Sequence, residues 1–479
     1  MRCIAAGALA ALAVSLLFLL AAGYFAVPGA DDYRYGRQTH AAWETQRTVF
    51  AVIAAAGEET AETYLDWQGS YAAIFLMSLH SGIFGVEWYC IGIWILILFF
   101  CIGEAVFAWD LLLCVFRTKR ETACLGAATL CLASIWFVPS PVEAFYWYNG
   151  GIYYSFFFAL SCFAGALLIR RFCVGVRKRD GILLFLFAIL IGGGNLVTGL
   201  LCCCFSLCMV LAMLIRKRVD RTVILSIAVL LAAYLINVFA PGNTVRQMEN
   251  TLRSAPGGMA AVWSGIRDAA SFSFQWMRNP GPWLILAAIP WLKGTDHRPI
   301  SGLIFLGCIL ASFLAIAAGF TPSEYALSIP GEARLIDIQY DLFLVLFLLC
   351  GIIGGKWLTG LIWNVKKGIL LKKAVFSVLM LMICGTAMVS GRQGSCISAA
   401  RILFSGAGRS YRMEWIERTA LLENQETKIL IFPRLSRKPP LICQMDLASD
   451  IKDPYYFYNE QVAEYYGKEL VLCEKGTEE

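Results

Sequence analysis

Long apolar runs separated by short polar stretches form the main pattern along this chain. Eleven such runs precede residue 392, and most approach the length that a helix needs to cross a hydrocarbon core about 30 Å thick. Barrel strands would instead alternate apolar and polar residues over short segments. The pattern predicts an all-α polytopic membrane protein with about 11 transmembrane helices. The predicted spans are 4–27, 88–114, 122–138, 151–169, 181–194, 196–215, 222–240, 280–292, 299–319, 335–355 and 373–391.

The positions of the basic residues predict the orientation of these spans. If the N-terminus is cytoplasmic, the inner loops contain 20 Lys and Arg residues, and the outer loops before residue 392 contain eight. Cytoplasmic loops of membrane proteins are enriched in Lys and Arg. We therefore expect the N-terminus and residues 117–120 to be cytoplasmic and the first acidic residues of the chain to face outside.

Two long segments, 28–87 and 241–279, then lie on the outer face. Residues 71–84 are apolar, but the parity of the crossings predicts an interfacial or re-entrant helix there instead of another span. Residues 259–277 mix aromatic side chains with single charges, as a helix in the membrane interface does. The glycine-rich residues 192–195 indicate a broken helix between two spans.

The composition changes after residue 391. Residues 392–479 contain 25 charged residues among 88, whereas 15% of the whole chain is charged. We predict that residues 1–391 form the transmembrane domain and that residues 392–479 form a small extracytoplasmic α/β domain. The predicted elements of this second domain are helices at 409–424 and 455–466 and strands at 428–433 and 469–473.

Nothing in the sequence indicates a nucleotide or a histidine-bound metal. It contains no G-x-x-x-x-G-K-[ST] phosphate loop and only three histidines, and its cysteines lie mostly inside apolar runs. We expect no required cofactor and no nucleic-acid partner.

Asp31 and Asp32 stand where the first predicted span ends, in the stretch GADDYRYGRQ. A carboxylate just outside the hydrocarbon boundary is partly desolvated, which raises its pKa and makes it a better base. A second acid can share a proton or help to bind a divalent cation such as Mg²⁺ or Mn²⁺. The structural alternative is a helix N-cap. Both residues are therefore candidate catalytic groups and, if a metal ion binds, candidate ligands.

Aromatic and charged residues elsewhere on the outer face are candidate substrate-binding groups. The aromatic side chains of residues 142–156 can stack on a sugar ring, although an aromatic belt at the membrane interface gives the same enrichment. Arginine suits a phosphate because its planar fork stays charged, whereas Arg334 can equally pair with Asp337 inside the protein. Glu104 and Asp110, inside the second span, are expected to pair internally. The candidates are Tyr33, Glu143, Trp147, Tyr148, Asn149, Tyr153, Arg246 and Arg334.

Five stretches in order along nearly the whole chain stand out: ADDYRYG, FYWYNGGIYYSF, APGNTVR, the Pro-x-x-x-Arg of residues 330–334 and DLASDIKDPYYFYNEQVAEYYG. With the acid pair, the many spans and the charged C-terminal end, the chain resembles the GT-C superfamily of membrane glycosyltransferases. The five stretches resemble, more closely, an uncharacterised bacterial family of multi-span proteins with a first-loop DDY motif. The chain departs from the family pattern at Gly69-Ser70, where the relatives tend to have Gly-Arg.

The resemblance implies transfer of a sugar (hexosyl or pentosyl) from a polyprenyl-phosphate carrier to a glycan, lipid or protein acceptor outside the bacterial plasma membrane. It makes Asp31 or Asp32 the general base and assigns the lipid phosphate to Arg246 or Arg334. Two other functions remain open: a transporter or flippase of a lipid-linked glycan, and a non-catalytic component of envelope assembly. The concentration of charge in outer loops, away from the membrane midplane, counts against transport.

Overall fold

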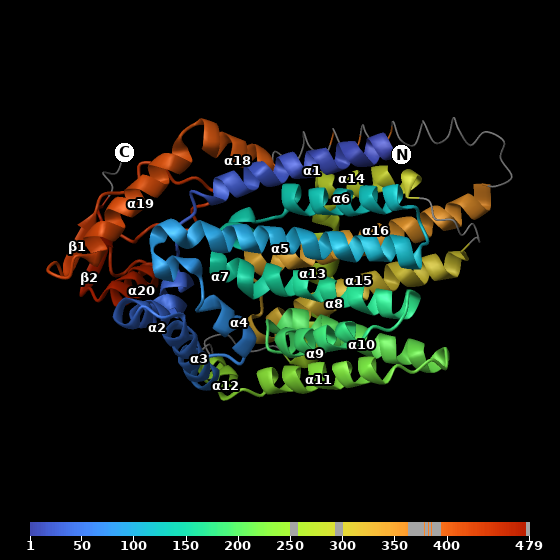
Figure 1. The fold of residues 1–479 in the computed structure, drawn as a ribbon, viewed down its shortest axis with the longest axis horizontal. Coiled ribbons are helices and arrows are strands. Elements are labelled where there is room, and N and C mark those ends of the chain that lie inside the picture. The colour runs from blue at the N-terminus through green and yellow to red at the C-terminus, as the bar shows by residue number, and fades with distance from the viewer. Residues whose placement is uncertain are drawn as a thin grey trace.

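Helices form most of this molecule, as its computed structural model shows (Figure 1). The structure describes residues 1–249, 257–292, 300–362 and 394–475, with three single positions between 363 and 393. Within these residues, seven helices are long and apolar enough to cross a membrane, in agreement with an all-α polytopic protein. They are α1 (Arg2–Gly23); Val86–Val115, with α5 (Tyr89–Asp110); Tyr148–Cys173, with α7 (Tyr148–Gly151) and α8 (Phe157–Cys173); α10 (Leu196–Ile215); Arg221–Met248, with α11 (Arg221–Val238) and α12 (Pro241–Glu249); α15 (Gly302–Leu327); and Ala333–Leu358, within α16 (Ala333–Ile362).

The other four predicted spans are shorter, more polar or outside the described residues. Helices α6 (Arg120–Phe137) and α9 (Lys178–Gly192) both begin with charged residues, and α9 ends at a run of glycines. The next predicted span is only a short helix, α14 (Pro280–Ala288), continued by the turn η6 (Ile289–Trp291), where Pro290 has no N–H to continue the helical hydrogen bonding. The predicted span 373–391 lies outside the described residues except at single positions.

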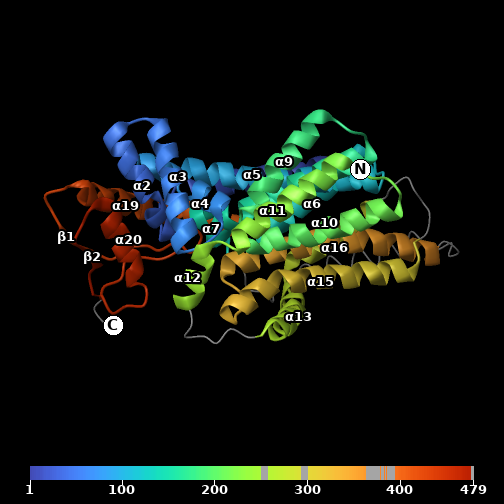
Figure 2. The ribbon, with the colours of Figure 1, turned by 90° about the horizontal axis from the view of Figure 1, so that it is seen from below.

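The long helices follow the long axis of the molecule and produce two different ends (Figures 1 and 2). The end near the N-terminus has short basic loops. The other end has α12, the C-terminal elements and the helices α2 (Asp31–Gln46) and α3 (Val49–Asp66). Predicted inner and outer segments thus lie at opposite ends of one bundle. Ion pairs at the basic end join Arg2 to Glu121 at 3.0 Å, Arg170 to Asp110 at 2.5 Å and Arg171 to Asp220 at 2.5 Å.

Polar side chains inside the bundle find partners on neighbouring helices. Glu104 of α5 is fully buried and accepts a hydrogen bond from the Ser134 hydroxyl of α6 at 2.9 Å. Asp337 of α16 accepts one from the backbone N–H of Ser140 at 2.7 Å. Each bond satisfies one carboxyl oxygen, and a polar group left unpaired in an apolar interior costs roughly 2–7 kcal/mol. The second oxygen of Glu104 is buried without a hydrogen-bond partner among the described residues.

The predicted interfacial stretch 71–84 forms α4 (Tyr71–Met77) and the 3-10 turn η1 (Ser81–Phe84), which the turn η2 (Val86–Trp88) connects to α5. The chain reverses its direction at the glycine run after α9. This turn lies beside α4, since the N–H of Ala72 donates to the carbonyl of Gly193 at 2.8 Å. This break between α9 and α10 agrees with the predicted broken helix. The second predicted interfacial segment contains α13 (Gly258–Trp276), which packs on α15 at the side of the bundle (Figure 2).

The elements predicted after residue 391 are all present. Helix α18 (Ser395–Phe404) lies along α1, and α19 (Ala407–Glu423) follows it. The strands β1 (Ile429–Phe432) and β2 (Leu470–Cys473) pair in parallel, with Ile429 opposite Leu470. Parallel strands need a crossover connection, which includes α20 (Tyr456–Tyr466) and passes beside α2 at the outer end of the bundle.

Candidate functional site

Asp32 is completely buried where α2, α5 and α7 meet. Its carboxylate accepts hydrogen bonds from the Tyr89 hydroxyl at 2.7 Å and from the backbone N–H groups of Gly29 and Asn149 at 3.0 Å each. Burial raises the pKa of Asp32 to about 7, although all three donors favour the charged form. Both oxygens of Asp32 therefore accept hydrogen bonds, which connect the segment before α2 to α5 and α7.

Asp31 has different surroundings. It is partly exposed, and its one hydrogen bond among the described residues comes from the Gln461 amide of α20 at 3.4 Å. Asp31 forms no ion pair with any of the described residues. The backbone before it is strained, since Ala30 has a φ of 42°, and such strain persists only where the surroundings enforce it. Asp31 is thus the accessible acid of the two.

Arg334 begins α16 beside the two acids. Its guanidinium lies 5.0 Å from the centre of the Trp147 ring and 3.5 Å from the Glu143 carboxylate, which also accepts the Arg334 N–H at 3.1 Å. The indole of Trp147 donates to the carbonyl of Gly29 at 3.0 Å, just before the acids. Asp31 and Glu143 both lie within electrostatic range of Arg334. The ion-pair partner of Arg334 is thus Glu143, whereas the structural alternative considered from the sequence was an aspartate of the same helix.

Arg246 approaches from α12. Its guanidinium donates to the Gln68 side-chain carbonyl at 2.9 Å and lies 5.3 Å from the centre of the Trp67 ring. Arg34 of α2 lies 5.1 Å from the same ring. Neither guanidinium has a carboxylate partner in the described part of the chain. Two cations therefore lie near one indole without an ion pair among the described residues, and Glu59 lies within electrostatic range of Arg34.

These two groups of residues form one cluster. Tyr154 lies within electrostatic range of both Arg334 and Arg246, and Tyr35 lies within range of Asp31 and Arg246. The predicted residues that the fold brings together here are Asp31, Glu143, Trp147, Tyr153, Arg246 and Arg334. We call these residues, with Arg34, Tyr35, Trp67, Gln68 and Tyr154, the outer cluster.

Three other predicted site residues are buried and contact only other parts of the protein among the described residues. Tyr33 is 1% exposed and packs against Tyr458, Tyr465 and Tyr466, so it attaches α2 to α20. Tyr148 is buried, and its hydroxyl donates to the carbonyl of Leu76 at 3.3 Å. Asn149 binds Asp32 through its backbone, while its buried side-chain amide lacks a hydrogen-bond partner among the described residues.

Sequence reasoning missed Arg34, Trp67, Gln68 and Gln461. Arg34 lies in the same short stretch as the acid pair, and Trp67 and Gln68 lie directly before Gly69-Ser70, where the chain departs from the family pattern. The Ser70 hydroxyl forms a hydrogen bond with the Tyr153 hydroxyl at 2.8 Å, so this departure falls next to the cluster. Gln461, more than 400 residues from Asp31 in the chain, lies in the last of the stretches that carry the resemblance, but nothing in the sequence indicates that it contacts Asp31.

Metal ligands are sparse in this region. The described ranges contain no group of three or more His, Cys, Asp or Glu side chains placed to hold a metal ion. The oxygens of Asp32 already accept three hydrogen bonds. A divalent cation at Asp31 and Asp32 stays a prediction from the sequence.

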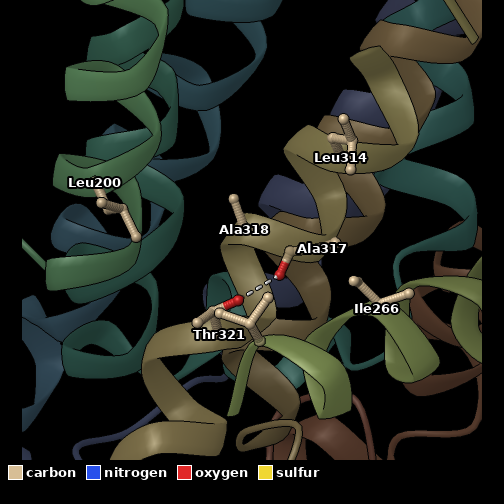
Figure 3. A pocket seen from close by; sticks show the side chains of 7 residues that line it. Leu200, Ile266, Leu314, Ala317, Ala318 and Thr321 are labelled. Atoms are coloured by element: carbon tan, nitrogen blue, oxygen red, sulfur yellow. Dashed lines mark hydrogen bonds between the residues drawn. The ribbon is translucent and has the colours of Figure 1, made fainter. Parts of the chain in front are cut away.

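A separate apolar pocket of about 260 Å³ lies between α10, α13 and α15 (Figure 3). Its polar member is Thr321, whose hydroxyl donates to the Ala317 carbonyl at 2.9 Å and is thereby occupied. A lining without ionisable groups suits a hydrocarbon chain and offers nothing for acid–base chemistry. The other lining residues are Leu200, Val262, Ile266, Leu314 and Ala318.

Comparison of the chain with protein-family models, with curated proteins and with solved structures finds no match.

Proposed function

We propose that this protein is a membrane glycosyltransferase that moves a sugar from a polyprenyl-phosphate carrier to an acceptor of the cell envelope. The observation that carries the proposal is the outer cluster, in which an accessible carboxylate without an ion-pair partner lies among arginines and aromatic rings. A base, a cationic site for the leaving phosphate and aromatic surfaces for a sugar are what such a transfer needs.

Asp31 acts as the general base in this proposal. It accepts the proton of the acceptor hydroxyl while the acceptor oxygen bonds to the anomeric carbon. The bond from that carbon to the phosphate oxygen breaks, and its electron pair leaves with the lipid phosphate. Asp32 has a structural role instead, because its carboxylate already accepts three hydrogen bonds in a fully buried site. This division refines the prediction that either acid is the base.

We infer the orientation from the basic residues. The basic end of the bundle is cytoplasmic, and the outer cluster and residues 392–479 are extracytoplasmic. In this arrangement α6, α9, α14 and the segment 373–391 complete eleven crossings with the seven long helices. After residue 391, α18 packs along α1, and the elements from α19 to β2 form the proposed soluble domain, which reaches the cluster through Gln461 and contributes to acceptor binding. The apolar pocket of α10, α13 and α15 suits the isoprenoid chain of the carrier.

The test is sugar transfer from a polyprenyl-phosphate sugar, measured per folded molecule with purified full-length protein in detergent. We expect Asp31→Asn to lower turnover by about 10²–10⁴-fold, the usual cost of losing a general base. Asp66→Asn, which neutralises an exposed acid on the same face, is the matched control and should change little. Normal turnover in folded Asp31→Asn protein would exclude the proposed base.

One observation favours transport as a second candidate function. Glu104 and Asp341 are both buried inside long helices, and ionisable groups at such positions often mark a translocation path. A transporter would move a lipid-linked glycan across proteoliposome membranes, and Asp31→Asn would leave that movement unchanged. The exposure of the outer cluster's charges at one end favours the transferase.

A further inference from the structure

The two-stranded sheet at the outer end of the molecule has apolar side chains on both of its faces (Figure 1). In β1 the buried residues alternate with Ile429 and Ile431, which are 56% and 60% exposed. The register places Leu470 and Leu472 of β2 beside them, on the same face. A sheet that is covered on one face usually alternates apolar and polar residues, whereas strands covered on both faces are apolar throughout. This composition indicates a sheet with more neighbours than the described residues provide.

The edge of β2 that faces away from β1 is closed. The Cys473 N–H donates to the Ala448 carbonyl at 3.0 Å, and the side-chain amide of Asn459 donates to the Val471 carbonyl at 2.9 Å. Asn459 is completely buried, and its side chain also bonds both backbone groups of Ala448, at 2.8 and 2.9 Å. Another strand could pair along this edge only by displacing these contacts.

The opposite edge of the sheet, formed by β1, is open. The Glu474 N–H donates to the Phe432 carbonyl at 2.8 Å, so Phe432 directs its backbone groups toward β2. Successive residues of a strand direct these groups to opposite sides. The backbone groups of Ile429 and Ile431 therefore point away from β2, where no other described residue forms a hydrogen bond with them. An open edge of this kind is a template for another strand.

We propose that β1 pairs antiparallel with β1 of a second copy of this chain, which joins the two sheets into one; the inference does not depend on the proposed function. Leu430 then lies opposite its counterpart, and Ile429 of each copy exchanges backbone hydrogen bonds with Ile431 of the other. The pairing is self-complementary, as a twofold interface must be. Pro433 has no N–H and ends the pairing after β1. The joined sheet is bounded by the closed edges of the two β2 strands, so it stops at two copies.

Charges beside β1 select this register. With Leu430 opposite its counterpart, Glu426 in the turn before β1 comes beside Arg434 of the other copy. Both residues are exposed, and neither forms an ion pair with another described residue. Opposite charges across a strand pair stabilise it. A shift of two residues in one direction would place Lys428 beside Arg434, where like charges repel, and a shift in the other direction would place Glu426 beside the buried Phe432.

The contact is short, so it suits two copies that a membrane already holds together. Copies inserted with the same orientation present β1 at the same height, and confinement to one bilayer raises their effective concentration. Association should therefore increase with the ratio of protein to lipid and should be weak for dilute protein in detergent.

The first experiment measures Förster transfer between donor- and acceptor-labelled full-length protein in proteoliposomes, over a series of protein-to-lipid ratios. We expect Glu426→Arg and Arg434→Glu each to raise the ratio for half-maximal transfer about tenfold, because both ion pairs of the dimer become like-charge pairs. The double variant exchanges the two charges and should restore wild-type association. Glu460→Arg, which reverses an exposed acid of α20, is the matched control and should change nothing. Wild-type protein without transfer at any ratio would overturn the proposal, as would transfer that neither reversal changes.

Introduced cysteines test the register directly. In the proposed pairing the Cα atoms of Ile429 and of Ile431 in the other copy are about 5.5 Å apart, within the range of a disulfide. A mixture of Ile429→Cys and Ile431→Cys proteins should therefore form a linked dimer when it is oxidised in proteoliposomes. Ile431→Cys alone should not, because its diagonal neighbours are roughly 7–8 Å apart. Wild-type protein gives the background of the native cysteines, and equal linking of the mixture and of Ile431→Cys alone would overturn this register.

Discussion

The surroundings of Trp67 and Trp147 make the same kind of contact and differ in charge, because Trp67 has two arginines without an ion pair among the described residues and Trp147 has one arginine that pairs with Glu143. Both rings carry a guanidinium at about 5 Å, at distances of 5.1 and 5.3 Å for Trp67 and 5.0 Å for Trp147. Beside Trp147 the Glu143 carboxylate neutralises Arg334, whereas the described residues around Trp67 provide only the neutral Gln68 amide. An arginine with an internal counter-charge mainly fixes helix packing, and an arginine without one is available to an anion. We therefore call the surroundings of Trp147 the structural half of the outer cluster and the surroundings of Trp67, for which we propose anion binding, the binding half.

The largest effect on this comparison should come from Gln68→Glu. This change places a carboxylate against Arg246, so that one of the two arginines at Trp67 acquires a counter-charge, as Arg334 has beside Trp147. We expect affinity for a polyprenyl phosphomonoester, the leaving group of the proposed transfer, to fall tenfold or more, about 1.4 kcal/mol, without a loss of thermal stability, because the new charge pairs with an existing one. Binding titration and thermal unfolding of the same sample measure both.

Gln247→Glu is the control for this change, since it adds the same charge to an exposed position next to Arg246 in the chain. Equal losses of affinity in both variants would mean that long-range charge, and not the contact with Arg246, governs binding.

The reverse change, Glu143→Gln, should have a smaller effect. It releases Arg334 and weakens the hydrogen bond to the Arg334 N–H, so we expect a loss of about 1–3 kcal/mol of stability, the cost of disturbing a partly buried charged hydrogen bond. Phosphomonoester affinity should rise slightly because a third cation becomes available. Glu332→Gln, at an exposed neighbouring position, should change neither quantity. A fall in affinity with unchanged stability would assign Glu143 to the binding half.

The smallest effect concerns pH. Because the pKa of folded Asp32 is about 7, above its ordinary value of 3.8, the folded state holds this proton more tightly than the unfolded state does. Its contribution to stability is complete below the ordinary pKa and is lost as the pH rises toward about 7. We expect the apparent melting temperature of the wild type to decline over this interval, and Asp32→Asn to reduce the decline. An identical pH dependence in the two proteins would contradict the assignment of this group.

The sequence by itself determined the membrane class and most of the elements. Apolar runs long enough to cross a bilayer must form helices there, since no water satisfies their backbone groups. Charge density and the alternation of short apolar segments predicted the helices and strands after residue 391, all of which are present. The predicted span 280–292 is a short helix and a turn, because Pro290 has no backbone N–H to continue the helical hydrogen bonding.

The tertiary structure alone decided how neighbouring residues differ. Asp31 and Asp32 are equivalent in the sequence, but Tyr89 and Asn149, which are distant in the chain, enclose only Asp32. Arg34 and Arg246 meet at Trp67 because α2 and α12 lie at the same end of the bundle. Burial and the presence of a counter-charge depend on which distant segments pack together, and local sequence patterns do not contain that information. For the same reason the candidate base was predicted from its position, and its neighbours were found only in the folded chain.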